Sequence, residues 1–332
     1  TIAHYTGGSI IDWLIWTVPV AGIAQLTLTW SAAAKAGFGL KLHLPKPNPD
    51  MRLLLVTAIP AALATGVMQI NLVLGQLVAS RFEGAVSWLF AADRLYQLPL
   101  GVVGIAVGIV LLPDLSRKLK AGDAVGAREA FSRAGEIALA LTVPAAIALI
   151  VIPLPLVSVL FGRGETGPDD VAAIAVATAI YGLGLPAFVL QKVQQPLYFA
   201  RSDTRSPFRF ALVAMVSNAG SAFGLAPVIG WMAPALATTL AGWAMVALLA
   251  LGSRKMGPEA RFDSRFWRRL WRIVFASILM GACLWAAKLT LTLALDLPLI
   301  RYAALILALI FSLLYLFGGL RLGELRGAMR RG

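Results

Sequence analysis

The stretch from residue 91 to residue 117 reads AADRLYQLPLGVVGIAVGIVLLPDLSR, a long apolar run with two adjacent charges near its start. A run of about 20 apolar residues is long enough to cross the hydrocarbon core of a bilayer as a helix. Asp93 and Arg94 lie within that length, where insertion scales assign a charged side chain a cost of roughly 2.5–3.5 kcal/mol. Charged residues inside a membrane helix are functional by default, so this stretch predicts both a membrane fold and a site.

The composition of the whole chain agrees with a membrane protein. Hydrophobic residues make up 59% and charged residues 14% of the 332 residues, against roughly 45–50% and 25% in soluble domains. The net charge of +13 comes from short Lys and Arg clusters between apolar runs, and a basic stripe interleaved with aromatics, as in nucleic-acid binders, is missing. A single cysteine, Cys283, and two isolated histidines exclude an intrachain disulfide and argue against a metalloenzyme.

Nine apolar runs are long enough to span a membrane. We expect each to be a helix, because helices and closed barrels alone satisfy the backbone in lipid and the alternating pattern of a barrel is missing. The predicted spans are residues 9–34, 53–79, 84–112, 134–161, 170–200, 208–230, 233–252, 271–294 and 298–320.

The basic residues alternate between the gaps and thereby predict an orientation. Lys and Arg concentrate after the first, third, fifth and seventh spans and in the tail, which the positive-inside rule assigns to the cytoplasm. An odd number of spans then places the N-terminus outside. Because the chain starts TIAHYTGG, with neither Met nor a basic signal segment, we expect it to be the C-terminal part of a longer polytopic protein.

The longest gap, residues 253–270, mixes arginines with Phe262, Phe266 and Trp267, and Trp271 follows it. This pattern favours an interfacial helix held by anionic lipids and aromatic anchors, with a specific partner site as the alternative. The gap also separates seven spans from a final pair.

On a helix, one narrow stripe of residues 91–117 is polar and small: Arg94, Gln97, Gly101, Gly104 and Gly108. Glycines at these positions allow another backbone or a bulky ligand to approach closely. Arg94 then has two interpretations. It is tied to a carboxylate or to free carbonyls of a neighbouring helix, or it faces a water-filled cavity where its planar fork can hold a phosphate. Asp93 lies about 100° around the helix and either orients Arg94 or pairs across helices.

A second polar cluster lies in the inner half of the predicted span 170–200. Lys192 and Gln195 belong to it, together with two further glutamines. Lys192 either faces the cavity or snorkels toward the interface, and the amides either face the cavity or bind other helices.

Weaker polar signals lie at Asn71, Asn218 and the pair Thr238 and Thr239. Amides and hydroxyls in lipid usually hydrogen-bond between helices. The sharper alternative is a sodium site made of oxygen ligands.

Three segments resemble the MurJ (MviN) family of lipid II flippases, which belongs to the multidrug/oligosaccharidyl-lipid/polysaccharide exporter superfamily. They are ADRLYQLPLGVVGIAVGIVLLPDLSR at 92–117, VLFGRG at 159–164 and LGLPAFVLQKVQQPLYFARSDTRSP at 183–207. The resemblance implies an all-α polytopic fold of fourteen helices, with two six-helix lobes around a central cavity and a final helix pair. Residues 1–40 would then hold the last helix of the first lobe, residues 41–252 the second lobe, and residues 253–332 the interfacial segment, the final pair and a basic tail.

The resemblance also implies a function. Such a flippase is not an enzyme: it moves the undecaprenyl-pyrophosphate-linked precursor across the bacterial inner membrane by alternating access. Its partners would be lipid II, membrane lipids and the missing N-terminal helices, with no nucleic acid. Arg94 matches a cavity arginine expected to hold the pyrophosphate, and Gln97 stands where some relatives carry glutamate.

The resemblance implies no cofactor, with possible coupling to the membrane potential or to sodium, for which Asn71, Asn218 and Thr238 are loose counterparts of a family site. Two alternatives remain: a drug/cation antiporter of the same superfamily, and a non-transporting structural fragment. The second would be supported by an Arg94 buried against protein on all sides.

Overall fold

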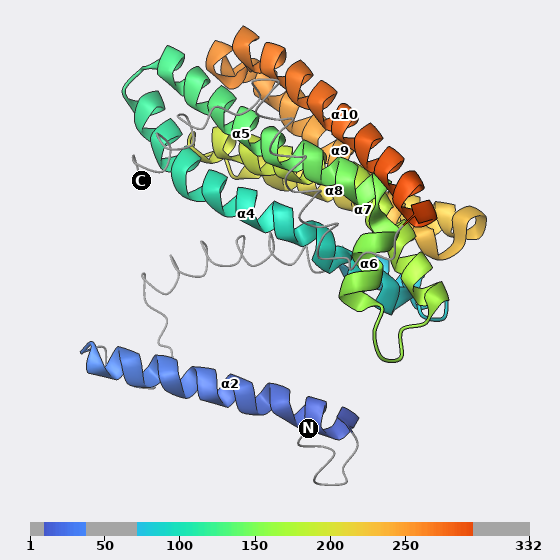
Figure 1. Cartoon of the computed structure of the whole chain (residues 1–332). Helices are drawn as coiled ribbons and strands as arrows, with labels where there is room; N and C mark the ends of the chain where they lie inside the picture. The colour runs from blue at the N-terminus through green and yellow to red at the C-terminus, as the bar shows by residue number, and fades with distance from the viewer. Residues whose placement is uncertain (1–9, 38–71, 295–332) are drawn as a thin grey trace. The chain divides into compact units, whose positions relative to one another are not determined.

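The structure is a computed structural model, and it describes residues 10–37 and 72–294 (Figure 1). The chain divides into two units, Thr1–Ala61 and Ala62–Gly332. Within the described ranges the secondary structure consists of helices and turns, without a strand. The helices are α2 (Ile10–Lys35), α4 (Ala85–Lys120), α5 (Ala124–Val151), α6 (Pro153–Phe161), α7 (Pro168–Phe199), α8 (Arg205–Ile229), α9 (Ala233–Ser253) and α10 (Ser264–Ala294), with short 3-10 turns η1 (Gly230–Met232), η2 (Arg254–Met256) and η3 (Pro258–Ala260).

The first unit contributes α2, a 26-residue helix that is apolar on all sides. Its described side chains from Ile15 onward are almost all exposed. A helix without a polar face is typical of a membrane span, and its bounds confirm the helix predicted for residues 9–34.

The second unit is a helical bundle built around α7. This helix packs against α4, α5, α6 and α9, while α8 lies along α9 and α10 along α5. Two glycines explain how closely α7 and α9 approach. A Cβ added at Gly242 would lie 2.6 Å from the Phe188 ring, and one at Gly184 would lie 2.9 Å from the same ring. Phe188 therefore occupies the space that both glycines leave open.

Four helical stretches among the described residues are long and apolar enough to cross a membrane: Ala124–Val151, Pro168–Phe199, Arg205–Met256 and Pro258–Ala286. The predicted spans 170–200, 208–230 and 233–252 match α7, α8 and α9 closely. Of the predicted span 53–79, the structure describes residues 72–79, which are helical. The predicted span 298–320 lies outside the described residues.

The prediction of one helix over residues 134–161 is wrong. α5 begins at Ala124 because the Asp123 carboxylate accepts a hydrogen bond from the Gly126 N–H (2.8 Å) and caps the helix. It ends at Val151, and the backbone at Ile152 leaves the helical region before α6 starts at Pro153. A proline suits the first turn of a new helix, since its missing N–H has no partner there.

The predicted interfacial helix at 253–270 is also corrected. The segment consists of η2, η3 and the first turns of α10, which starts at Ser264. Its aromatic residues divide between two environments: Phe266 is buried, whereas Trp267 and Trp271 are exposed. The Phe262 ring stacks on Phe131 of α5, with centroids 4.4 Å apart.

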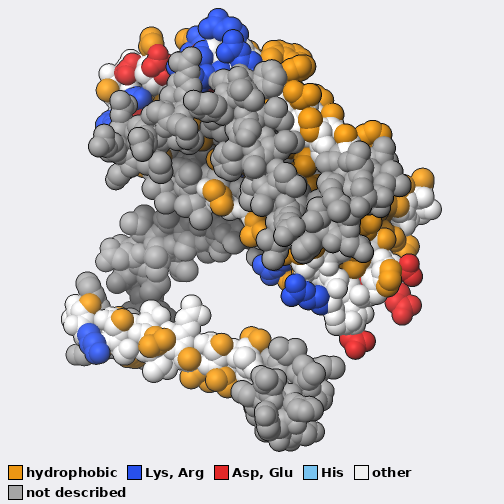
Figure 2. All heavy atoms as spheres, in the orientation of Figure 1, with side chains coloured by type: hydrophobic (Ala, Val, Ile, Leu, Met, Phe, Trp, Pro, Cys, Tyr) orange, Lys and Arg blue, Asp and Glu red, His pale blue; other side chains and the backbone are white. Residues whose placement is uncertain are grey.

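The basic connections of the second unit meet at one end of the bundle. Arg201, after α7, pairs with Glu259 of η3 at 2.9 Å, and Arg133 of α5 pairs with Asp263, just before α10. Figure 2 shows Lys and Arg side chains gathered where α5 and α10 begin. Trp88, near the start of α4, bonds to Asp170 at the start of α7 at the opposite end. The alternation of basic and less basic gaps thus corresponds to the two ends of the bundle.

Candidate functional site

A cavity of about 430 Å³ lies in the second unit between residues 72–79, α4, α7 and α9. Its wall combines apolar side chains with charged, amide and hydroxyl groups. The lining residues that carry polar groups are Gln76, Asp93, Arg94, Tyr96, Gln97, Tyr181 and Thr238. Ligand sites typically have this composition: an apolar wall and a few convergent polar groups.

Arg94 extends from α4 into the wall of this cavity and is exposed. Its guanidinium carbon lies 4.6 Å from the centroid of the Phe90 ring, one helical turn earlier. Such a cation–π contact holds the side chain in place and leaves its N–H donors available. Among the described residues Arg94 forms no ion pair, so its charge is not used by the helices around it.

Asp93 lines the same cavity but does not pair with Arg94. Its carboxylate accepts a hydrogen bond from the Gln97 side-chain amide, one turn later. Two tyrosines complete this side of the cavity: the rings of Tyr96 and Tyr181 lie with centroids 5.0 Å apart. The described residues thus give Asp93 two neutral donors, the Gln97 amide and the Tyr96 hydroxyl, but no basic partner.

The small-residue stripe of α4 is open where its side chains are described. A Cβ added at Gly101 or Gly104 would meet nothing within 4 Å. No described helix therefore uses these glycines for close packing, and they leave room beyond Arg94 and Gln97 for a ligand or another part of the protein.

Two predicted site residues lie elsewhere. Lys192 of α7 is exposed and Gln195 is half-buried, and neither lines the cavity that contains Arg94. A neighbouring amide binds between helices: the Gln191 Nε2 donates to the Gly242 carbonyl of α9 at 3.0 Å. A role for Lys192 and Gln195 in binding stays a prediction.

The three residues predicted as sodium ligands do not lie together in the described structure. Thr238 lines the cavity and donates its hydroxyl to the Pro234 carbonyl at 2.8 Å. Asn218 is buried on α8 and is not among the lining residues, and Asn71 lies outside the described residues. The described part of the chain contains no group of three or more His, Cys, Asp or Glu residues placed to hold a metal ion.

The aromatic part of the cavity is not among the features predicted from the sequence. Phe90 and Tyr96 carried a usable signal, since they lie four residues before Arg94 and three after Asp93, the spacings that bring side chains together on a helix. Tyr181 carried none, because it reaches the cavity from another helix.

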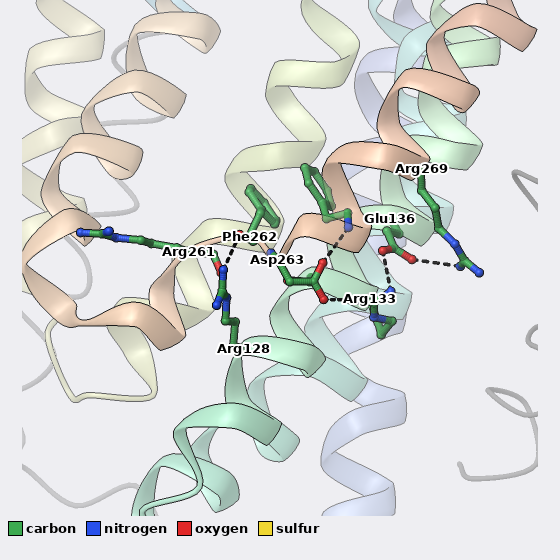
Figure 3. Close-up of polar contacts among 9 residues, drawn as sticks. Arg128, Arg133, Glu136, Arg261, Phe262, Asp263 and Arg269 are labelled. Carbon is green, nitrogen blue, oxygen red and sulfur yellow. Dashed lines mark hydrogen bonds and ion pairs between the residues drawn. The ribbon is translucent and has the colours of Figure 1, made fainter.

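A second charged group, the ion-pair cluster, joins α5 to α10 and consists of Arg133, Glu136, Asp263 and Arg269 (Figure 3). Glu136 is only 4% exposed and lies 2.5 Å from Arg133 Nη1 and 3.0 Å from Arg269 Nη1. Arg133 also pairs with Asp263, whose other oxygen accepts from the Phe266 N–H at 2.6 Å and so caps α10. Every charge here has a partner, which indicates a structural role.

Comparison with known proteins places the chain in a family. The family model for "Lipid II flippase MurJ" matches residues 2–311. The chain is 46% identical over 231 residues to a probable lipid II flippase MurJ of Rhizobium tropici, covering 70% of this chain and 43% of the relative. It is 46% identical over 236 residues to the corresponding protein of Rhizobium meliloti (strain 1021), covering 71% of this chain and 44% of that relative.

A solved structure described as "Lipid II flippase MurJ, inward closed conformation" has the same fold, with a TM-score of 0.69 and 22% identity over 83% of this chain and 56% of that one. The chain thus spans less than half the length of the two Rhizobium relatives. The match across almost all of its residues shows that it belongs to the MurJ family of lipid II flippases.

Proposed function

We propose that this chain is the part of a lipid II flippase that carries one wall of the substrate cavity. The observation that carries the proposal is the placement of Arg94: in a chain of this family, an arginine of α4 without an ion-pair partner among the described residues lines a cavity. The protein would move the lipid-linked precursor from the inner to the outer leaflet of the bacterial inner membrane.

The chemistry of the arginine suits a pyrophosphate. A guanidinium presents its donors in a planar fork that matches two phosphate oxygens at once. The contact with Phe90 orients this fork without using its donors. The polar head of the substrate would cross along the open stripe of α4, and its apolar tail would remain in lipid.

Alternating access of the lobes is the motion that fits this family, with binding at a fixed site near the middle of the membrane. The charge of Arg94 provides a means of coupling, because moving one charge through 100 mV is worth about 2.3 kcal/mol. We further propose that the basic end of the bundle, where α5 and α10 begin, faces the cytoplasm.

A drug/cation antiporter is the weaker candidate. A cavity that exports cations should be rich in carboxylates, whereas the described wall has a single carboxylate, Asp93, beside a free arginine. The family match also favours lipid II.

The test is rescue of cells depleted of their own flippase. We would build a chimera in which this chain replaces the matching region of the Rhizobium tropici relative, with the unaltered relative as the positive control. The proposal predicts growth and flipping by the chimera. Failure of the chimera at normal membrane levels, while the unaltered relative rescues, would contradict it.

A further inference from the structure

Asp93 and Arg94 of α4 line one cavity without neutralising each other. We propose that the cavity binds a ligand with two charged groups, in which Arg94 holds the anionic group and Asp93 holds an ammonium group. The inference rests on the proposed function and extends it: on a lipid-linked pyrophosphate that carries a peptide, the ammonium would be a free side-chain amine of that peptide.

The hydrogen bonding of Asp93 leaves room for such a ligand. An ionised carboxylate has about four acceptor sites. The described residues supply two neutral donors, the Gln97 amide and the Tyr96 hydroxyl, so acceptor sites remain for a ligand. Arg94, its neighbour in sequence, turns toward Phe90 instead. A carboxylate that stays unpaired inside a membrane protein is costly, and a cationic ligand would remove that cost when it binds.

The surroundings of Asp93 favour an organic cation. Tyr96 and Tyr181 add aromatic rings beside the carboxylate, and ammonium groups bind well to aromatic faces combined with a negative charge. A volume of about 430 Å³ lies in the range of small-molecule sites, roughly 300–1,000 Å³. A single metal ion would leave most of it empty.

The position of the two residues sets the shape of the ligand. Consecutive helical residues point about 100° apart. Asp93 and Arg94 therefore point toward different parts of the same cavity, not toward a single point in it. A ligand that satisfies both must carry its ammonium and its anionic group on separate arms. A pyrophosphate and an amine-bearing peptide attached to one sugar head have this arrangement.

The experiment compares two probes on the same protein. The chimera with the Rhizobium tropici relative would be titrated with lipid II that carries lysine in its peptide, and with the same lipid after acetylation of the lysine amine. We expect acetylation to weaken binding about tenfold, the effect of losing one charge-assisted hydrogen bond. In Asp93→Asn the two lipids should bind with equal affinity, while Arg94→Ala should weaken both.

Asp114→Asn is the matched control. Asp114 lies on the same helix, pairs with Arg117 at 2.6 Å and Lys118 at 2.8 Å, and does not line the cavity. This variant should keep the full tenfold difference between the probes.

The outcomes separate the two proposals. Equal binding of both lipids to the unaltered chimera would overturn the ammonium site and leave the flippase function standing. A tenfold difference that persists in Asp93→Asn would assign the amine to another residue and also overturn the site. Absence of binding by either lipid would contradict the proposed function itself. Because the first comparison uses the unaltered protein, it holds even if Asp93→Asn fails to fold.

Discussion

Glu136 on α5 and Asp93 on α4 are both carboxylates on long helices of the same bundle, but their surroundings are opposite. Glu136 is 4% exposed and lies within 3.0 Å of two arginines, one from its own helix and one from α10. Asp93 accepts from a neutral glutamine and lines a cavity. The basic residues differ in the same way. The arginines beside Glu136 pair with its carboxylate, whereas Arg94 faces the cavity beside a phenylalanine.

This contrast distinguishes charged residues that stabilise the fold from charged residues that are available to a ligand. Charges that meet partners within the protein hold helices together, and removing one leaves the other uncompensated. Charges kept in a cavity without partners do not hold helices together and are available to a ligand.

Replacing Arg94 should abolish transport without weakening the fold. In the chimera we expect Arg94→Ala to lower flipping by at least about 100-fold, since it removes two charge-assisted hydrogen bonds to phosphate. Arg94→Lys should recover part of the activity, because a lysine keeps the charge but not the planar fork. Rescue of flippase-depleted cells measures both, and full rescue by Arg94→Ala would refute a binding role.

Replacing Glu136 should have the reverse effect. We expect Glu136→Gln to lower the free energy of unfolding by roughly 2–3 kcal/mol, because two arginines lose a buried anionic partner. Thermal unfolding in detergent measures it. Glu129→Gln is the control, on the same helix but exposed, and it should leave the unfolding midpoint unchanged. Equal midpoints for the two variants would show that the ion-pair cluster does not stabilise the bundle.

The start of α4 offers a smaller test. Trp88 Nε1 donates to Asp170 Oδ1 at 2.7 Å and links α4 to α7. Trp88→Phe keeps the ring but loses this bond to a carboxylate, so we expect a small lowering of the thermal unfolding midpoint. Trp271→Phe, at an exposed position of α10, should have no measurable effect. A Trp88→Phe protein as stable as the unaltered one would leave this end of α4 without its proposed anchor.

The smallest effect is expected at Asp203, which lies before α8 and accepts from the Ser206 N–H at 3.0 Å. Hydrogen bonds from the Ser206 side chain and backbone lower the pKa of Asp203. A lowered folded-state pKa stabilises the protein above the unfolded pKa, and this stabilisation is lost as the pH falls through the folded value. Asp203→Ala should therefore cost roughly 0.5 kcal/mol at neutral pH, with a smaller difference below about pH 4. A difference independent of pH would contradict a stabilising hydrogen bond from Ser206 to an ionised Asp203.

The sequence was sufficient for the features that follow from local periodicity. Most helices of the second unit, and the polar stripe of α4 that contains Arg94, come directly from apolar runs and the helical repeat. The break at Ile152 was missed because an apolar count does not distinguish one long helix from two, although Pro153 marked the start of α6. Tyr181 and the pairing of Arg133 with Asp263, 130 residues apart, depend on tertiary packing that no local pattern encodes.

On this interpretation Asp93 and Arg94 of α4 serve binding, and the paired charges of α5 serve stability. The most direct test measures lipid II affinity and the thermal unfolding midpoint for Arg94→Ala and Glu136→Gln in the same chimera. We expect Arg94→Ala to bind lipid II more weakly at an unchanged unfolding midpoint. We expect Glu136→Gln to unfold at a lower temperature while its affinity for lipid II changes less. An Arg94→Ala protein that unfolds as early as Glu136→Gln but still binds lipid II with full affinity would contradict this interpretation.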